Sequence, residues 1–176
     1  MQLRNSLTRR PPPDYEAFSY VWGDIKDVRC IELEGAIVPI TRNLDSALRH
    51  LHREDEKIIL WADVLCINQN DIKERLHEVS QMNPIYRQAT RVVVWPGEGW
   101  DGSNIAMEFL RKLGDDETLY LGPSPVPCIS VGSRHLDSPS LCRHTIHLFD
   151  LPWWKRTWTV QEFVLAQDLV FQCSTS

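Results

Sequence analysis

Three short apolar segments dominate the patterning of this chain, and each is followed by a turn and then by a helical segment. They are Tyr15–Trp22 (YEAFSYVW), Ile58–Cys66 (IILWADVLC) and Arg91–Trp95 (RVVVW). Near-continuous apolar runs of this length are typical of strands covered on both faces, as in a parallel sheet. Strands that alternate with helices predict an α/β fold, a three-layer sandwich with a mainly parallel central sheet.

The segments between these strands carry helix signals. Asn43 is a predicted N-cap for a helix with one apolar face. Asp71 and Glu74 resemble a capping box at the start of a second helix, which Pro84 is expected to kink or interrupt. The remaining predicted elements are a helix from Ser103 to Gly114, a short helix over 141–150, a helix over 159–166 and a last strand over 168–173.

Two further segments shape the domain organisation. Arg29–Leu33 and Ala36–Ile40 flank a Glu-Gly pair and predict a short edge hairpin. Residues 115–140 show no periodicity and hold four prolines, so we expect a long insertion there. Residues 1–14 are expected to be a flexible N-terminal arm, and residues 15–176 one domain.

Composition narrows the classes of partner and compartment. The net charge of −5 and the lack of a basic block disfavour nucleic acid, whereas the excess of arginine over lysine, 14 to 5, leaves a phosphate-bearing small molecule open. The five cysteines include no C-x-x-C pair, which favours a reducing compartment. Because no apolar run is long enough to span a bilayer and no secretory signal is visible, we expect a cytoplasmic protein without a membrane partner.

The carboxyl ends of the predicted strands gather polar and aromatic residues. Ligands of open α/β sheets bind beyond these ends, which here carry the sequences Trp22-Gly23-Asp24 and Asn68-Gln69. Asp63 is the one charged residue in its apolar run. Ordinary turn and cap chemistry explains these residues about as well as ligand binding does.

A series of long motifs resembles the fungal heterokaryon incompatibility (HET) domain. They are YEAFSYVWGD, NLDSALRHL, LWADVLCINQND, VVVWPG and RTWTVQEFVLA, in that order along the chain. Small departures include Glu78, where the family favours Gln. The resemblance implies a trigger of regulated cell death in non-self recognition, joined to other regions of a longer protein or to an upstream receptor.

The HET family is in turn distantly similar to Toll/interleukin-receptor (TIR) domains, several of which hydrolyse NAD. The similarity lies in the residues after the first strand and in Trp158-x-x-x-Glu162, which resembles the segment that carries the TIR catalytic glutamate. The resemblance implies a TIR-like or flavodoxin-like fold, and NAD glycohydrolase activity with Glu162 as the catalytic carboxylate. The substrate-binding residues expected for this activity are Ser19, Tyr20, Trp22, Gly23, Asp24, Asp63, Asn68, Gln69, Arg156 and Trp158.

The residues around Glu162 allow two interpretations. Trp158 lies one helical turn earlier on the same face, and a carboxylate on a partly apolar face is costly unless it is paired or used. A salt bridge to Arg156 is the structural alternative to catalysis. In NAD cleavage a carboxylate stabilises the ribosyl cation, so NAD is expected as a substrate and no cofactor is needed.

Two other groups of residues suggest metal binding weakly. Cys142, His144 and His147 include ligand types but no partner cluster, and Asp24 with Asp63 would make a small acidic pocket. We expect no metal site at either. The alternative to an enzyme is a non-enzymatic signalling module that transmits the death signal by assembly, and a homo-oligomer is expected in both cases.

Overall fold

Five parallel strands form the central sheet of the computed structural model, which describes residues 2–3, 14–33, 35–115, 130–131, 134–135 and 139–174. Their order across the sheet is β1-β5-β2-β6-β9, and every neighbouring pair is parallel. The strands are β1 (Gln2–Leu3), β2 (Glu16–Tyr20), β5 (Ile59–Trp61), β6 (Arg91–Trp95) and β9 (Leu169–Phe171). Without the two-residue β1, the order in chain sequence is 2-1-3-4, which is the flavodoxin-like arrangement.

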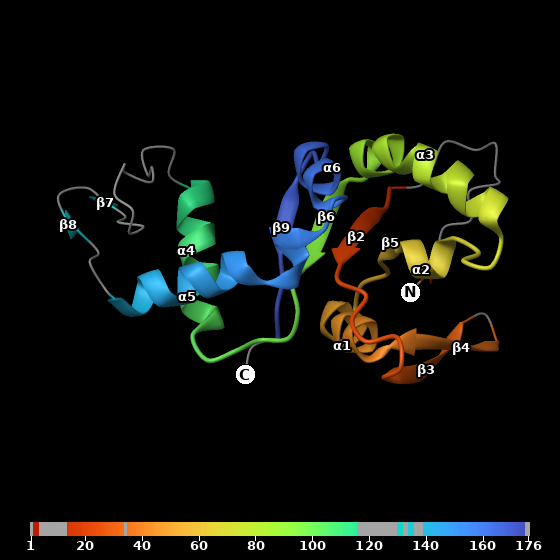
Figure 1. Ribbon diagram of the computed structural model, residues 1–176, viewed down its shortest axis with the longest axis horizontal. Helices are drawn as coiled ribbons and strands as arrows, with labels where there is room; N and C mark the ends of the chain where they lie inside the picture. The colour runs from red at the N-terminus through yellow and green to blue at the C-terminus, as the bar shows by residue number, and fades with distance from the viewer. Residues whose placement is uncertain are drawn as a thin grey trace.

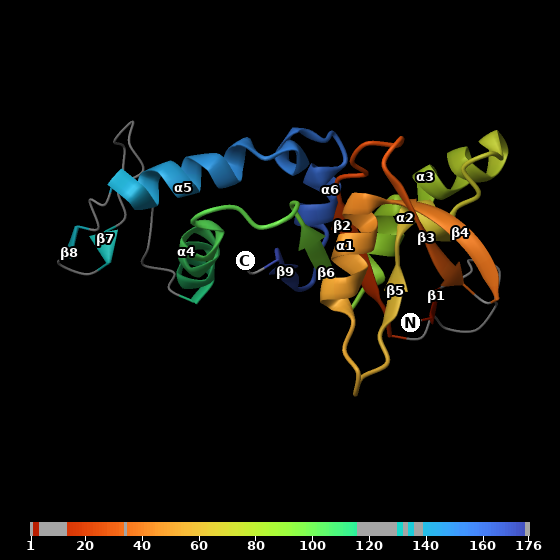
Figure 2. The same cartoon turned by 90° about the horizontal axis from the view of Figure 1, so that it is seen from below.

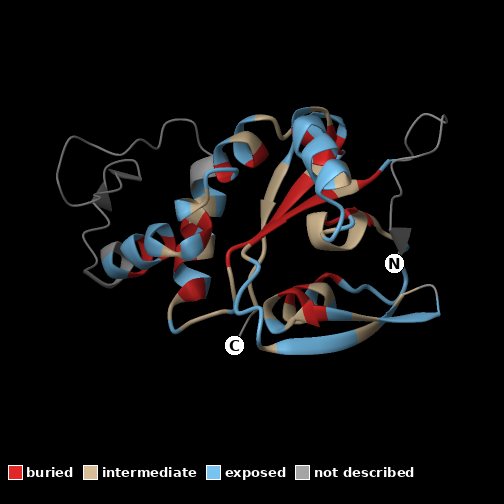
Figure 3. Cartoon of the chain, turned by 45° about the vertical axis from the view of Figure 1, so that its right-hand side comes forward, coloured by how far each residue is buried: buried red, intermediate tan, exposed pale blue. Residues whose placement is uncertain are grey.

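Helices cover both faces of this sheet, so the predicted three-layer α/β sandwich is confirmed. Figure 1 shows α1 (Arg42–Leu51) on one side and α3 (Ile72–Gln88) with α6 (Thr159–Val164) on the other. Strand side chains alternate between the two layers. Ala17, Val92 and Val94 pack with the α3 residues and with Trp153 of η1 (Pro152–Lys155), whereas Phe18, Val93 and Trp95 pack with α1. Figure 3 shows the resulting pattern, with buried strands between helices that expose their outer faces.

The predicted hairpin is present, but as a separate sheet. The strands β3 (Val28–Leu33) and β4 (Ala36–Thr41) pair antiparallel and pack through Ile31, Val38 and Ile40 against α1 rather than extending the central sheet. Gly35 takes a φ of +80° at the turn, a conformation that favours glycine.

Two helices pack against each other at one end of the molecule. Helix α4 (Ser103–Asp115) packs against α5 (Pro139–Asp150), and both lie beyond the β9 edge of the sheet in Figures 1 and 2. A small antiparallel pair, β7 (Ser130–Val131) and β8 (Arg134–His135), falls within the expected insertion. The rest of that insertion, residues 116–129, 132–133 and 136–138, lies outside the described residues.

Three local predictions differ from the structure. The expected strand over Ile58–Cys66 ends at Trp61, and Asp63–Cys66 form the short helix α2. The expected cap Asn43 lies inside α1, whose N-cap is Thr41. Pro84 lies within α3, which is continuous from residue 72 to residue 88, so of the two outcomes expected there the interruption is wrong and the kink stays a prediction.

The predicted start of α3 is confirmed, because the Asp71 carboxylate accepts hydrogen bonds from the backbone N–H groups of Lys73 and Glu74. Within the arm expected to be flexible, Gln2 and Leu3 pair with β5. None of the helices in the described part of the chain is long and apolar enough to cross a membrane.

Candidate functional site

A cleft opens at the carboxyl ends of the parallel strands. Its volume is about 390 Å³, and its lining comes from the turn after β2, from α2 and the loop after it, from α3 and from the segment before α6. Its lining residues are Val21, Trp22, Gly23, Asp63, Ile67, Gln69, Arg75, Val79, Met82, Arg156 and Trp158. The cleft therefore lies where the strand order of a flavodoxin-like sheet places ligands.

The turn after β2 is held in place by Asn43 of α1. The Asn43 amide donates to the Val21 carbonyl at 2.5 Å, and its oxygen accepts from the Trp95 indole at 3.1 Å. Gly23 has a φ of +78°, and a Cβ there would lie 3.1 Å from the Asn43 Cβ. Asn43 thus joins the ends of β2 and β6 instead of capping its helix.

Trp22 and Asp63 are hydrogen-bonded to each other in the lining of the cleft. The Trp22 indole, 39% exposed, donates to Asp63 Oδ2 at 2.9 Å. Asp63 is the first residue of α2, and its Oδ1 accepts from the Val64 N–H at 2.7 Å. Gln69 donates from its side chain to the Asp63 carbonyl at 3.1 Å and so holds the loop after α2 against the cleft.

Glu162 lies outside the cleft lining, in a buried polar network behind it. Its carboxylate is 1% exposed and accepts two hydrogen bonds from Arg156, at 3.0 and 2.9 Å. The Ser19 hydroxyl donates to the same carboxylate, and the Trp153 indole donates to the Ser19 oxygen at 2.7 Å. Arg156 also lines the cleft, so this one side chain links the cleft to the buried acid.

Burial raises the pKa of Glu162 above its usual value of 4.5, and the charge of Arg156 and the Ser19 hydrogen bond oppose the rise without cancelling it. Tyr86 donates to the Phe18 carbonyl at 3.2 Å. Burial, followed by the nearby charge of Glu162, raises the pKa of Tyr86 well above its usual value of 10.0. A carboxylate with a raised pKa, paired with one arginine, is a common arrangement at catalytic sites and also occurs in structural ion pairs.

Tyr20 lies between the same charges. Its side chain is buried, and burial followed by the Asp63 carboxylate raises its pKa well above 10.0, while Arg156 lowers it. The Asp63 carboxylate is close enough to act on this hydroxyl, but no hydrogen bond of normal geometry to it is present among the described residues. A buried hydroxyl that stays unpaired is costly, so a polar group of a ligand would satisfy it.

The predicted site residues therefore separate into three groups. Six line the cleft: Trp22, Gly23, Asp63, Gln69, Arg156 and Trp158. Ser19, Tyr20 and Glu162 are buried next to it. Asp24 and Asn68 are exposed outside it, where each accepts a backbone hydrogen bond two residues further along the chain, from Lys26 and Asn70.

Three residues of this region were missed by sequence reasoning. Trp153 supports Ser19, Tyr86 lies near Glu162, and Arg75 lines the cleft. Arg75, Val79 and Met82 are spaced at i, i+4 and i+7 on α3, so helical periodicity was a signal for the position of Arg75. Nothing in the sequence linked Trp153 or Tyr86 to Glu162.

The residues with metal-ligand chemistry are held by other contacts. His144 is buried against Gly102, where an added Cβ would lie 2.2 Å from the imidazole, and the His147 ring stacks at 5.0 Å from Trp100. The Cys142 side chain lies outside the described residues. In the described part of the chain, no group of three or more His, Cys, Asp or Glu residues could hold a metal ion.

Comparison with known proteins shows the family of this chain. The sequence profile of the heterokaryon incompatibility protein (HET) family matches residues 15–162. The chain is 35% identical to Heterokaryon incompatibility protein 6, OR allele, of Neurospora crassa, and the match covers 93% of this chain and 29% of that protein. No solved structure matches. The chain therefore belongs to the HET family and corresponds to less than a third of the length of this relative.

Proposed function

We propose that this chain is the HET domain of a longer incompatibility protein and that it triggers fungal cell death by cleaving NAD in the cytoplasm. Family membership supports the role in incompatibility. The observation that carries the enzymatic part is the desolvated Glu162 carboxylate, joined through Arg156 to a cleft with the indoles of Trp22 and Trp158 in its walls.

The chemistry suits one carboxylate. In NAD, the bond between the ribose C1′ and the pyridinium nitrogen breaks, and its electron pair leaves with neutral nicotinamide. Glu162 stabilises the positive charge on the ribose and takes a proton from the attacking water, whose oxygen forms the new bond to C1′. Because the leaving group departs neutral, no second acid is required. Trp22 and Trp158 offer faces on which the nicotinamide or adenine can stack.

One step must precede this reaction. Both Glu162 oxygens are bonded to Arg156 and the acid is shielded from the cleft, so Arg156 has to move before the carboxylate can meet a ribose. The described arrangement is thus a resting state of the proposed enzyme.

The deciding experiment is to incubate the concentrated protein with NAD and follow released nicotinamide. Glu162→Gln keeps the shape of the side chain and removes the charge, so we expect a folded protein with no cleavage. Glu78→Gln is the matched control, since Glu78 is another buried glutamate of the described chain but lies outside the cleft lining. Full activity in a folded Glu162→Gln variant would contradict the assignment.

A second function is favoured by the surface of α6. Val160, Phe163 and Val164 on this short helix are 66%, 45% and 69% exposed, next to the buried Glu162. Exposed apolar side chains of this kind mark protein contacts. The alternative proposal is therefore a signalling module that acts by homo-oligomerisation, with an upstream receptor or other regions of the full-length protein as partner. A wild-type protein that assembles and signals without releasing nicotinamide would favour this alternative.

A further inference from the structure

Arg75 lines the same cleft as Arg156 but lies on a different element, α3. It lies on the exposed side of α3, in line with Val79 and Met82. The Arg75 backbone N–H donates to the Asp71 carbonyl at 2.9 Å, but none of the hydrogen bonds or ion pairs found in the described part of the chain involves its side chain. Its guanidinium is therefore available to a ligand in the cleft.

The charges in the cleft are arranged asymmetrically. Asp63 already accepts hydrogen bonds from Trp22 and from the Val64 backbone, whereas Arg75 has no anionic partner and Arg156 shares its charge with Glu162. Guanidinium groups bind phosphate oxygens in a bidentate manner, and two of them in one cleft match the two phosphates of a diphosphate.

We propose that Arg75 and Arg156 together bind the diphosphate of a dinucleotide substrate, with the aromatic walls of Trp22 and Trp158 beside it. This inference rests on the proposed function and adds the group by which the substrate is recognised. The buried hydroxyl of Tyr20, which lies close enough to Arg156 and Asp63 for both to shift its pKa, supplies a further donor next to this position.

Binding of the diphosphate to Arg156 has a consequence for Glu162. A guanidinium fork that turns toward a phosphate cannot keep both of its hydrogen bonds to the carboxylate. Recognition of the diphosphate thus releases the acid that the resting state holds closed. A ribosyl pyridinium without a diphosphate lacks the means to open this pair.

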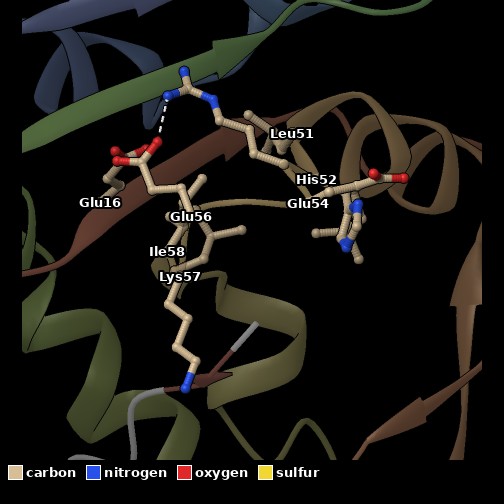
Figure 4. A pocket seen from close by; sticks show the side chains of 10 residues that line it. Glu16, Leu51, His52, Glu54, Glu56, Lys57 and Ile58 are labelled. Carbon is tan, nitrogen blue, oxygen red and sulfur yellow. Dashed lines mark hydrogen bonds and ion pairs between the residues drawn. The ribbon is translucent and has the colours of Figure 1, made fainter.

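The other cavity described here provides a control. It has a volume of about 190 Å³ and lies near the amino ends of β2 and β5, where Figure 4 shows Glu16, Glu54 and Glu56 around it. Arg53 lines this cavity and pairs with Glu56 at 2.7 Å. Arg53→Ala therefore removes one exposed positive charge, as Arg75→Ala does, but at a site rich in carboxylates.

The first test measures binding without turnover. Inorganic pyrophosphate and ADP-ribose are titrated by calorimetry into the wild type, Arg75→Ala, Arg75→Lys and Arg53→Ala. We expect Arg75→Ala to weaken both ligands about tenfold or more, which corresponds to about 1.4 kcal/mol. Arg75→Lys should bind with intermediate affinity and Arg53→Ala like the wild type. Unchanged binding in Arg75→Ala, equal loss in Arg53→Ala, or no binding of either ligand by the wild type would overturn the proposal.

The second test separates this inference from the proposed function. With NAD as substrate, Arg75→Ala should raise KM and leave kcat within about twofold. With nicotinamide riboside, which has no diphosphate, the wild type and Arg75→Ala should have the same rate of nicotinamide release. If the wild type binds pyrophosphate through Arg75 but does not cleave NAD, the diphosphate site is supported and the proposed glycohydrolase activity is contradicted. If the wild type cleaves NAD and Arg75→Ala has the same KM, the glycohydrolase activity is supported and the diphosphate site is contradicted.

Discussion

At the scale of single residues, Glu162 combines two opposing influences. Burial disfavours its charge, and Arg156 with Ser19 favours it, so its protonation state depends on a pair of contacts that a ligand can break. The structural alternative considered from sequence, an ion pair with Arg156, is present. The pair does not exclude catalysis, because Arg156 is 21% exposed and reaches the cleft.

The pH dependence of activity tests this balance. Glu162 must be charged to stabilise a ribosyl cation, so we expect NAD cleavage to rise with pH along a limb whose midpoint lies above 4.5, the usual value. Arg156→Lys should move the limb higher, since an ammonium cannot replace the bidentate contact. A limb at or below 4.5, or one that Arg156→Lys leaves in place, would contradict the role assigned to this pair.

The same shift makes a stability prediction with a definite sign. The folded state binds the Glu162 proton more tightly than the unfolded state does, and this tighter binding stabilises the fold. The stabilisation is complete below about pH 4.5, the usual pKa, and is lost as the pH rises through the raised pKa of the folded state. The free energy of unfolding of the wild type, minus that of Glu162→Gln, should therefore fall with increasing pH over this window. Urea unfolding at several pH values measures it, and a difference that rises with pH would show that the pKa is lowered instead.

Ser19 supports the network from β2. Ser19→Ala would leave the buried Trp153 indole without its acceptor and remove one donor from Glu162, so we expect a loss of about 1–3 kcal/mol in the free energy of unfolding. Ser80→Ala is the control, because its exposed hydroxyl bonds a helix carbonyl. Equal stability of Ser19→Ala and the wild type in urea unfolding would show that the network contributes nothing.

At the scale of elements, the segment from Ile58 to Ile67 shows why an apolar run does not determine secondary structure. The strand includes only Ile59–Trp61. The apolar residues that follow form a turn of helix and its C-cap, in which the partly buried Val64 and Leu65 pack on one face of the sheet and Ile67 packs on the other. The change from strand to helix falls at Asp63, whose side chain accepts a hydrogen bond from the next backbone N–H. The apolar pattern is the same in both cases.

Helix α3 depends on its cap, because Pro84 lies in its interior and prolines weaken helices. Asp71→Ala removes the acceptor for the N–H groups of Lys73 and Glu74, and we expect a loss of about 1 kcal/mol in the free energy of unfolding. Asp55→Ala, in the exposed loop before β5, should change it by less than about 0.5 kcal/mol. Denaturant unfolding followed by tryptophan fluorescence measures the free energy of unfolding of both variants. Equal losses in Asp71→Ala and Asp55→Ala would show that the cap does not stabilise α3.

At the scale of the whole molecule, the order of the strands assembles the cleft. Residues of the turn after β2, of α2, of α3 and of the segment before α6 are up to 137 positions apart, from Val21 to Trp158, and meet where the chain crosses from β5 past β2 to β6. Helix α6 presents Glu162 inward and Val160 and Val164 outward, so contact with a second copy on this surface would act directly on the element that carries the acid.

Assembly is therefore expected to affect activity. Specific NAD cleavage should increase with protein concentration, and Val164→Glu should abolish this increase by placing a charge on the exposed α6 surface. Ile37→Glu, at a hairpin position of similar exposure, 68% against 69%, is the matched control and should behave like the wild type. A dilution series combined with light scattering gives the answer, and constant specific activity of a monomer would exclude a role for assembly.

The sequence alone determined the layers, most of the elements and the family, because hydrophobic periodicity and turn residues act locally and the HET motifs lie in order along the chain. It also placed Trp22, Gly23 and Gln69 at one edge of the sheet, and the expected NAD site grouped Asp63, Arg156 and Trp158 with them. Only the tertiary structure decided that Arg156 closes over Glu162, that Asn43 joins two strand ends rather than capping a helix, and that Arg75 faces the cleft. These features depend on which side chains meet across the sheet, and a local pattern contains no information about partners distant in the chain.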